Sequence, residues 1–286
     1  MGMTKSLSKM GRIRVGIGGW NFAPWRDRFY PKKLPQKDEL AYASRQLTAI
    51  EINGTYYGTQ KKESFAHWRE VTPENFLFSL KGPRFTTNRR VLADAGASIE
   101  RFFSSGVLEL AEKLGPVNWQ FLPTKRFEPA DFESFLKLLP KTLEGRTLHH
   151  FVEVRHSSFQ TAAFVELARA YGVGIVFTDK PAFPQIPDLT STSFVYARLQ
   201  CAAEEEANGY PTEELDHWAK QARIFATGQI PHGLNLVGGP GSGAAKPHDV
   251  LIYFINGFKP KAPAAAMALI ARLGTEAQPL DGGQER

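Results

Sequence analysis

The stretch His150-Phe151-Val152-Glu153-Val154-Arg155-His156 places a carboxylate and a guanidinium two residues apart within an otherwise apolar segment. Residues two apart on a β-strand point to the same face. A Glu and an Arg on an inward face are costly to bury unless they pair with each other or serve a polar site. The stretch therefore predicts a strand whose inner face carries a charged pair.

Similar apolar runs that end in polar residues recur along the chain, and most are followed by a segment with helical spacing. There are eight strand candidates of this kind, which is the number of strands in a TIM (β/α)8 barrel of the α/β class. We expect one barrel domain over residues 13–274, a flexible leader over 1–12 and a disordered tail over 275–286. The candidate strands are 13–20, 49–53, 76–81, 117–121, 150–156, 175–179, 195–200 and 252–256.

Four segments between the strands carry more specific expectations. Ser98 is a plausible N-cap for a single helix that runs to Leu114, and Thr212 for a later one. The prolines of 180–187 make a regular helix after the sixth strand improbable. The glycine-rich segment 228–247 is interpreted as a mobile loop, because no Gly-Lys-Ser/Thr motif closes it as in a phosphate-binding loop.

The composition is that of a water-soluble globular protein, with 42% hydrophobic and 22% charged residues in a chain of 286. No segment approaches the roughly 20 apolar residues that span a bilayer, so no membrane partner is expected. The single cysteine, Cys201, excludes an internal disulfide. Together with a first segment that lacks the apolar run of a secretory signal, this predicts a cytoplasmic protein.

The charge is unevenly distributed. Residues 1–90 hold 17 Lys and Arg against 7 Asp and Glu, whereas the remainder holds 18 against 22. This basic third could attract a phosphate-bearing partner, and a solvated surface with excess lysine explains it equally well. The aromatic segment 20–31 either covers a pocket or plugs the barrel mouth.

The alternation along the strands predicts which side chains reach the barrel mouth, where sites form in this fold. Apolar residues such as Ile50 and Ile52 would pack outward against the helices. The polar residues between and after them would converge at the carboxyl ends of the strands. These are Glu51, Asn53, Lys81, Gln120, Glu153, Arg155, Asp179, Arg198 and Asn256.

With these strand ends in place, the chain resembles the domain of unknown function 72 family, also called YecE-like. The resemblance covers about residues 13–273 and implies a TIM barrel, but no established activity. Where the family usually has Arg-Leu-His-Gly, this chain has Arg198-Leu199-Gln200-Cys201, which removes a possible acid, base or metal ligand. The matching stretches are 17–31, 51–57, 78–81, 113–116, 120–121, 152–156 and 197–199.

Three functions remain open. The first is an enzyme of the hydrolase or isomerase type acting on a small anionic, for example phosphorylated, substrate. Its proton-transfer candidates are Glu51, Glu153 and Asp179, and its substrate-binding candidates are Trp20, Asn53, Tyr56, Lys81, Gln120, Arg155, His156, Arg198 and Asn256. The second is a protein that binds or processes nucleic acid through Arg84, Arg89 and Arg90, with aromatic residues stacking on bases. The third is a ligand sensor or partner platform without catalysis.

A metal site would require Glu51, Glu153, Asp179 and His156 to meet. No close-spaced ligand motif such as His-Glu-x-x-His appears in the sequence. We therefore predict no metal site, and the sequence leaves the cofactor undefined.

Overall fold

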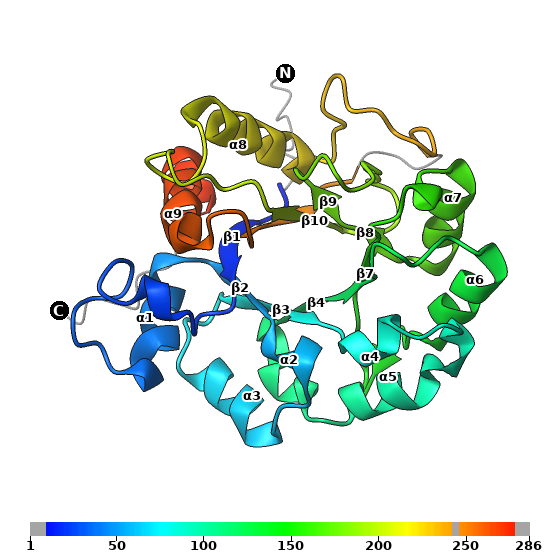
Figure 1. Ribbon diagram of the computed structural model, residues 1–286, viewed down its shortest axis with the longest axis horizontal. Coiled ribbons are helices and arrows are strands. Elements are labelled where there is room, and N and C mark those ends of the chain that lie inside the picture. The colour runs from blue at the N-terminus through cyan, green and yellow to red at the C-terminus, as the bar shows by residue number, and fades with distance from the viewer. Residues whose placement is uncertain (1–9, 242–245, 278–286) are drawn as a thin grey trace, which may run out of the picture.

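The strands of the computed structural model, which describes residues 10–241 and 246–277, form a parallel barrel surrounded by helices (Figure 1). Nine strands are hydrogen-bonded in the order β8-β7-β4-β3-β2-β1-β11-β10-β9. Their bounds are β1 (Ile13–Gly18), β2 (Ala49–Ile52), β3 (Leu77–Lys81), β4 (Leu114–Gln120), β7 (His150–Glu153), β8 (Gly174–Ile175), β9 (Phe177–Thr178), β10 (Phe194–Leu199) and β11 (Asp249–Phe254).

The barrel closes through one interrupted strand. Only Val176 separates β8 from β9, and β8 pairs with β7 whereas β9 pairs with β10. Counting β8 and β9 as one strand gives the eight strands of a (β/α)8 barrel, which confirms the predicted fold. A short antiparallel hairpin, β5 (Thr142–Leu143) and β6 (Arg146–Thr147), lies outside the barrel sheet.

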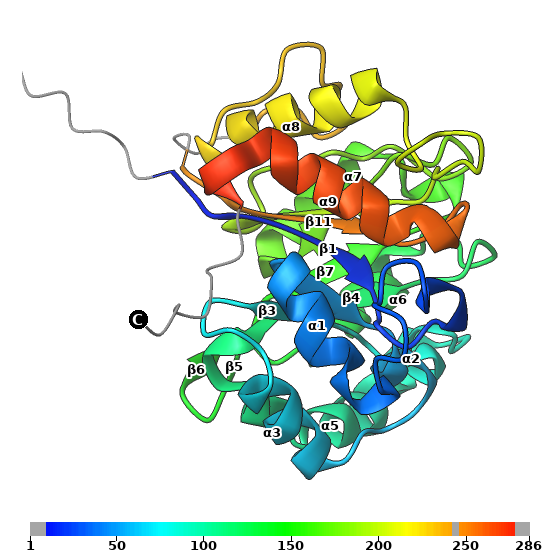
Figure 2. The ribbon, with the colours of Figure 1, turned by 90° about the vertical axis from the view of Figure 1, so that its left-hand side faces the viewer.

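The helices cover the outside of the barrel (Figures 1 and 2), and within the described residues none lies between β9 and β10, as the prolines predict. The α-helices are α1 (Glu39–Gln46), α2 (Gly54–Tyr57), α3 (Lys62–Glu70), α4 (Arg84–Thr87), α5 (Gly96–Phe103), α6 (Pro129–Leu138), α7 (Ala162–Tyr171), α8 (Thr212–Ala226) and α9 (Ala262–Leu273). The 3₁₀ helices are η1 (Ala23–Trp25), η2 (Gln36–Asp38), η3 (Leu92–Ala95), η4 (Val107–Lys113), η5 (Ser157–Phe159), η6 (Lys259–Lys261) and η7 (Gly274–Glu276).

Two apolar clusters follow from the alternation along the strands. The larger one contains Ile50 and Ile52 and joins the outer faces of the strands to the helices. The smaller one fills the barrel interior and includes Phe151, Tyr196 and Tyr253. Burial of this apolar surface, about 25 cal/mol per Å² removed from water, is the main stabilising contribution. The polar side chains that alternate with the outer cluster are therefore directed to the barrel interior.

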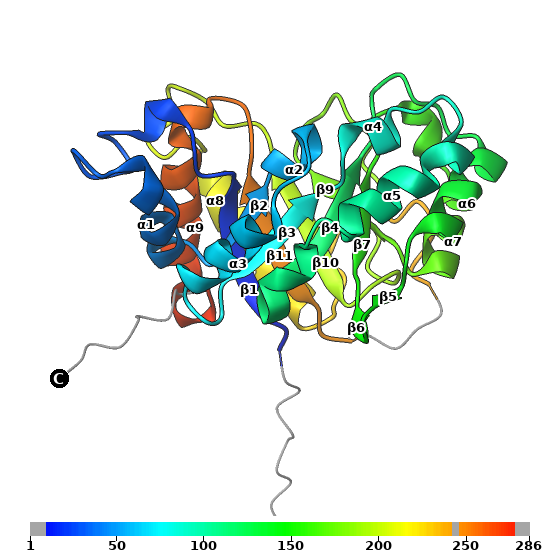
Figure 3. The same cartoon turned by 90° about the horizontal axis from the view of Figure 1, so that it is seen from below.

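The C-terminal mouth of the barrel is the upper end in Figure 3. There β1 rises from the bottom, while α2 and α4, which directly follow β2 and β3, lie at the top. In the described residues, no helix has both the length and the apolar character needed to cross a membrane.

Four local predictions differ from the structure. The helix expected over 98–114 is divided into α5 and η4, because the chain turns at Gly106 with a φ of 102°. Ser98 consequently lies inside α5, where its hydroxyl donates to the Ala95 carbonyl at 2.7 Å. Leu114 begins β4. Thr212 is the first residue of α8 rather than its N-cap, which is Pro211.

The predicted tail and loop are partly ordered. Thr275 lies in η7, and Ala277 is buried. Arg169 holds the glycine-rich segment by donating to the carbonyls of Gly238 at 3.0 Å and Gly239 at 2.7 Å. Residues 242–245 of this loop, residues 278–286 of this tail and residues 1–9 of the predicted leader lie outside the described residues.

Candidate active site

Buried ion pairs occupy the centre of the barrel mouth. Arg198 of β10 donates to both carboxylate oxygens of Glu51, from Nε at 2.9 Å and from Nη2 at 3.0 Å. Its third nitrogen, Nη1, donates to Glu153 of β7. Glu153 in turn accepts two hydrogen bonds from Arg155, at 3.0 and 2.6 Å. The charged pair of the opening stretch therefore exists, and it is one half of a larger network.

The network shifts the pKa values of Glu153 and Arg198 toward their charged forms. Burial alone would raise the pKa of Glu153, but the charges of Arg198, Arg155 and Lys81 lower it to about 2. Burial would lower the pKa of the Arg198 guanidinium, and Glu153 and Glu51 raise it instead. Paired, hydrogen-bonded ions of this kind tolerate a low-dielectric interior. Glu153 and Arg198 consequently stay charged through the physiological pH range.

Lys81, at the end of β3, lies beside these ion pairs with different partners. Its Nζ donates to the Gln120 side-chain oxygen at 2.7 Å and lies 4.1 Å from the centre of the Tyr56 ring. Burial and the neighbouring Arg198 lower the pKa of Lys81 to about 8. Unlike the two arginines, Lys81 forms no ion pair with a carboxylate in the described part of the chain. Its ammonium therefore contributes positive charge that the site does not neutralise by direct contact.

The proline-rich segment after β9 covers the edge of this cluster. The Phe183 ring centre lies 4.6 Å from the Arg155 guanidinium carbon and 5.3 Å from the Lys180 nitrogen. The Arg155 side chain is 18% exposed, against 2% for that of Arg198. A ligand that enters the mouth therefore meets Arg155 before it meets Arg198.

A cavity of about 280 Å³ opens at the same end of the barrel. Trp20, Asn53 and Lys259 contribute to its wall, at the carboxyl ends of β1, β2 and β11. The aromatic segment 20–31 contributes Trp20 and Phe22 to this cavity, while Trp25 is fully buried and donates from its indole nitrogen to the Lys259 carbonyl at 3.0 Å. The segment therefore lines a pocket through Trp20 and Phe22, as one of the two sequence interpretations expected, while Trp25 packs into the larger apolar cluster.

Tyr56 and Tyr57 connect the cavity with the ion pairs. Tyr57 lines the cavity, and its ring centre lies 5.2 Å from that of Tyr56, which in turn contacts Lys81. Burial lowers the pKa of the Lys259 ammonium, and Glu51 raises it. The cavity and the ion-pair cluster therefore form adjoining parts of one mouth.

Three predicted site residues lie outside this arrangement. Asp179 accepts from the backbone nitrogens of Gln200 at 2.7 Å and Cys201 at 3.2 Å and from the Tyr210 hydroxyl at 2.6 Å, so it ties the end of β10 to the loop after β9. His156 caps η5 by accepting from the Ser158 backbone nitrogen at 3.1 Å. Asn256 is exposed beyond the end of β11.

Sequence reasoning missed two inward side chains of the cluster. Asn118 of β4 donates to Glu153 at 3.3 Å, and the Tyr196 hydroxyl of β10 donates to Glu51 at 2.6 Å. Both lie two residues before a residue that was identified, Gln120 and Arg198 respectively. The same two-residue period, followed one step further into each strand, would have found them.

The described residues contain no group of three or more His, Cys, Asp and Glu side chains arranged to hold a metal ion. Glu51 and Glu153 are instead bridged by the Arg198 guanidinium. The oxygens that a divalent cation would need already accept hydrogen bonds from arginine.

The fold and this mouth define a parallel (β/α)8-barrel protein with a buried ion-pair cluster at the carboxyl ends of its strands. The chain belongs to the family described as "Protein of unknown function DUF72", whose model matches residues 14–285. It is 28% identical over 147 residues to the UPF0759 protein YecE of Escherichia coli (strain K12). That match covers 51% of this chain and spans about half, 50%, of the relative's length.

Solved structures of the same family share the fold. The chain is similar to a DUF72 family protein from Thermotoga maritima, with a TM-score of 0.70 and 23% identity over 92% of this chain and 99% of the other. A DUF72 family protein from Enterococcus faecalis gives a TM-score of 0.67 at 18% identity, over 91% and 95% of the two chains. These similarities confirm the barrel that the sequence predicted, and the match to the family model confirms the family.

Proposed function

We propose that this chain is an enzyme of the hydrolase or isomerase type that binds a small anionic substrate at the C-terminal mouth of the barrel. The observation that carries the proposal is the environment of Lys81. Its ammonium lies next to two carboxylates that arginines already pair, and it donates only to a neutral amide in the described contacts. With Lys81 protonated, the cluster holds three cations and two carboxylates, so an incoming anion completes its charge balance.

The hydrogen-bonding capacity of Lys81 supports anion binding. An ammonium has three donors, and the contact with Gln120 uses one of them. Charge-assisted hydrogen bonds to a phosphate or carboxylate are stronger than bonds between neutral groups. Arg155, the more exposed arginine of the cluster, could supply further donors to the same anion.

The proposal assigns proton transfer to Lys81 in preference to the carboxylates. A general acid or base works best when its pKa lies near the operating pH. The pKa of Lys81 is lowered to about 8, whereas that of Glu153 is lowered to about 2, which makes Glu153 a weak base. In this assignment Glu51 and Glu153 orient Arg198 and Arg155, and they raise the pKa of Arg198. Asp179 holds the neighbouring loop.

The uncharged part of the substrate would occupy the adjoining cavity. Aromatic and amide side chains such as Trp20 and Asn53 line it, and they suit the faces and hydroxyl groups of a sugar. A phosphorylated sugar would then place its phosphate at Lys81 and its ring beside Trp20. Dephosphorylation and isomerisation are the reactions to assay.

The test is calorimetric titration with ribose 5-phosphate, glucose 6-phosphate and inorganic phosphate, followed by assays for phosphate release and sugar isomerisation. Lys81→Met should weaken binding by roughly tenfold or more, because it removes a charge-assisted hydrogen bond. Lys37→Met removes a lysine from the exposed helix η2 and should leave binding unchanged. Equal affinity in the two variants would overturn the proposal. Binding without turnover would favour a ligand sensor over an enzyme.

One observation favours nucleic acid as the alternative ligand. The Tyr57 side chain is 66% exposed, the Arg84 guanidinium carbon lies 5.7 Å from its ring centre, and neighbouring Phe85 is 41% exposed. Exposed aromatic rings beside cations are typical of surfaces that stack single-stranded bases. Salt-dependent binding of a fluorescent single-stranded oligonucleotide that Tyr57→Ala abolishes, with no response to sugar phosphates, would favour this alternative.

A further inference from the structure

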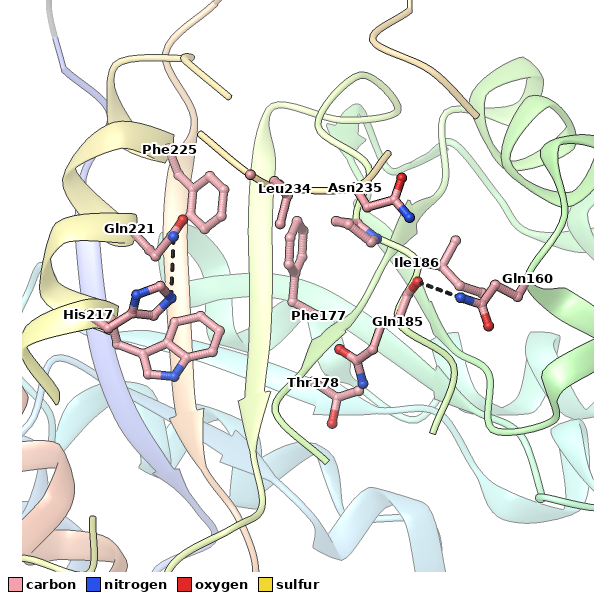
Figure 4. A pocket seen from close by; sticks show the side chains of 13 residues that line it. Gln160, Phe177, Thr178, Gln185, Ile186, His217, Gln221, Phe225, Leu234 and Asn235 are labelled. Atoms are coloured by element: carbon pink, nitrogen blue, oxygen red, sulfur yellow. Dashed lines mark hydrogen bonds between the residues drawn. The ribbon is translucent and has the colours of Figure 1, made fainter. Parts of the chain in front are cut away.

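A second cavity, also of about 280 Å³, lies in the helical layer where the barrel lacks a helix. No helix lies between β9 and β10 in the described chain, and the loops before β10 and after α8 border the space instead. Figure 4 shows the result. Side chains of α8 form one wall, and Gln160 and Gln185 from the opposite loops face them across Phe177. This cavity shares no lining residue with the ion-pair cluster of the mouth.

The cavity combines aromatic walls with neutral polar groups. None of the described residues that line it is Asp, Glu, Lys or Arg. Four amide side chains contribute instead: Gln160, Gln185, Gln221 and Asn235. Desolvating a full charge among such residues is costly, whereas an uncharged ring with donors and acceptors at its edge finds partners for each.

Gln221 adds an unsatisfied hydrogen-bonding atom to this cavity. Its side-chain nitrogen donates to His217 Nε2 at 3.3 Å, while its side-chain oxygen is shielded from solvent and has no partner among the described residues. Reversing the amide would let the oxygen accept from His217 and would leave the nitrogen unpartnered. Either orientation leaves one amide atom unpaired, and a buried polar atom without a partner costs about 1–3 kcal/mol. A ligand in the cavity reaches this shielded oxygen once the Gln221 side chain rotates toward it, and a complementary group at the ligand's edge would then recover that energy.

Gln185 is held so that it can contribute as well. Its side-chain nitrogen donates to the carbonyls of Lys180 and Phe183, both at 3.1 Å. These bonds use the donor end of the amide. They leave the side-chain oxygen as the acceptor for an N–H group of a ligand.

We propose that this cavity binds an uncharged planar heteroaromatic group with N–H donors and ring acceptors, of the kind found in nucleobases. The aromatic walls, including Trp218 and Phe225, would contact its faces, and the amides would pair with its edge. This binding is independent of the function proposed for the mouth, because the two sites have no lining residue in common.

The experiment measures binding of uracil, adenine and nicotinamide to the full chain by saturation-transfer NMR and tryptophan fluorescence. Two comparison ligands separate the effect of charge from the effect of the polar edge. Orotate is uracil with a carboxylate, and benzyl alcohol has a ring without an amide-like edge. At least one neutral base should bind roughly tenfold more tightly than either comparison ligand. A factor of this size is expected when two ligands differ by one buried hydrogen bond or by one buried charge.

Variants locate the site. Gln221→Leu should weaken the bound base by roughly tenfold and strengthen benzyl alcohol, because it replaces the unpaired amide with an apolar group. Gln36→Leu removes an exposed amide elsewhere and should change neither. Lys81→Met should leave base binding intact. A failure of anion binding at the barrel mouth can therefore be told apart from a failure of base binding in this cavity. The proposal is overturned if no base binds better than benzyl alcohol, or if Gln221→Leu, shown by circular dichroism to be folded, binds bases as the parent does.

Discussion

Arg198 and Glu51 form a bidentate ion pair across the barrel interior, although 147 residues separate them in the chain. Arg198 is 2% exposed and Glu51 is fully buried. The same guanidinium also holds Glu153. A single side chain on β10 thus compensates two carboxylates, one on β2 and one on β7.

Replacing this arginine should therefore destabilise the fold strongly. Arg198→Met leaves two buried carboxylates without their main partner, and we expect a loss of about 3–5 kcal/mol in the free energy of unfolding. Guanidinium chloride unfolding followed by circular dichroism measures it. Arg272→Met, which removes a surface pair with Asp216, should cost about 0–1 kcal/mol. Similar losses in both variants would show that the cluster contributes no more than a surface contact.

The ionised state of Glu153 should make stability depend on pH in the acid range. Its pKa is about 2 in the folded chain, against the ordinary pKa of 4.5 that it has in the unfolded chain. The unfolded chain therefore takes up the proton first as the pH falls. The stability that the ionised form contributes is complete above about pH 4.5 and is lost as the pH falls toward 2.

Denaturant unfolding between pH 2 and 6 tests this, with Glu153→Gln as the comparison. The variant has no proton to take up at this position, so its stability should fall less steeply over that range. Parallel pH profiles for the parent and the variant would show that Glu153 is not held ionised by its arginines.

Lys81 should titrate near neutral pH. Burial and Arg198 lower its pKa from 10.5 to about 8, so the folded chain releases this proton at a lower pH than the unfolded chain does. Between about pH 8 and 10.5 the unfolded state binds the additional proton, and this group makes the folded state more stable as the pH rises. Anion affinity should fall over the same range, because the neutral amine no longer attracts an anion.

NMR of the protein with ¹³C-methylated lysines measures this titration directly. The resonance that is absent from Lys81→Met identifies the residue, and its midpoint should lie near 8. A midpoint close to the ordinary lysine value of about 10.4 would remove the basis for assigning proton transfer to Lys81.

The sequence predicts the barrel because the residue pattern that marks each barrel strand lies within a short stretch of the chain. The alternation at Ile50, Glu51 and Ile52 is enough to orient a strand, and counting such strands defines the fold. The helix expected from Ser98 to Leu114 was wrong because apolar spacing alone does not register the backbone turn at Gly106.

The site was predictable in composition but not in pairing. Strand ends placed Glu51, Lys81, Gln120, Glu153 and Arg198 at one mouth, and the structure brings these residues into contact. Which arginine pairs with which carboxylate depends on the relative heights of strands across the barrel, and no short stretch of sequence encodes that. Asp179 follows its strand as the others do, yet its hydrogen-bond partners lie in the loop after β10 and hold it outside the cluster.

The packing of β1 against β2 offers a test of the barrel itself at Gly16. A Cβ on this residue would lie 1.8 Å from the carbonyl oxygen of Ala49, its register partner on β2. The obstacle is the backbone of a hydrogen-bonded strand, which cannot rotate away as a side chain can. We therefore expect Gly16→Ala to cost about 3 kcal/mol or more in the free energy of unfolding, at or beyond the upper end of ordinary overpacking.

Gly58→Ala adds the same methyl group where nothing lies within 4 Å, and should change stability by less than about 0.5 kcal/mol. Denaturant unfolding of the two variants compares one close strand contact with one open position. Equal stabilities of the two variants would mean that Gly16 of β1 and Ala49 of β2 do not lie in close backbone contact.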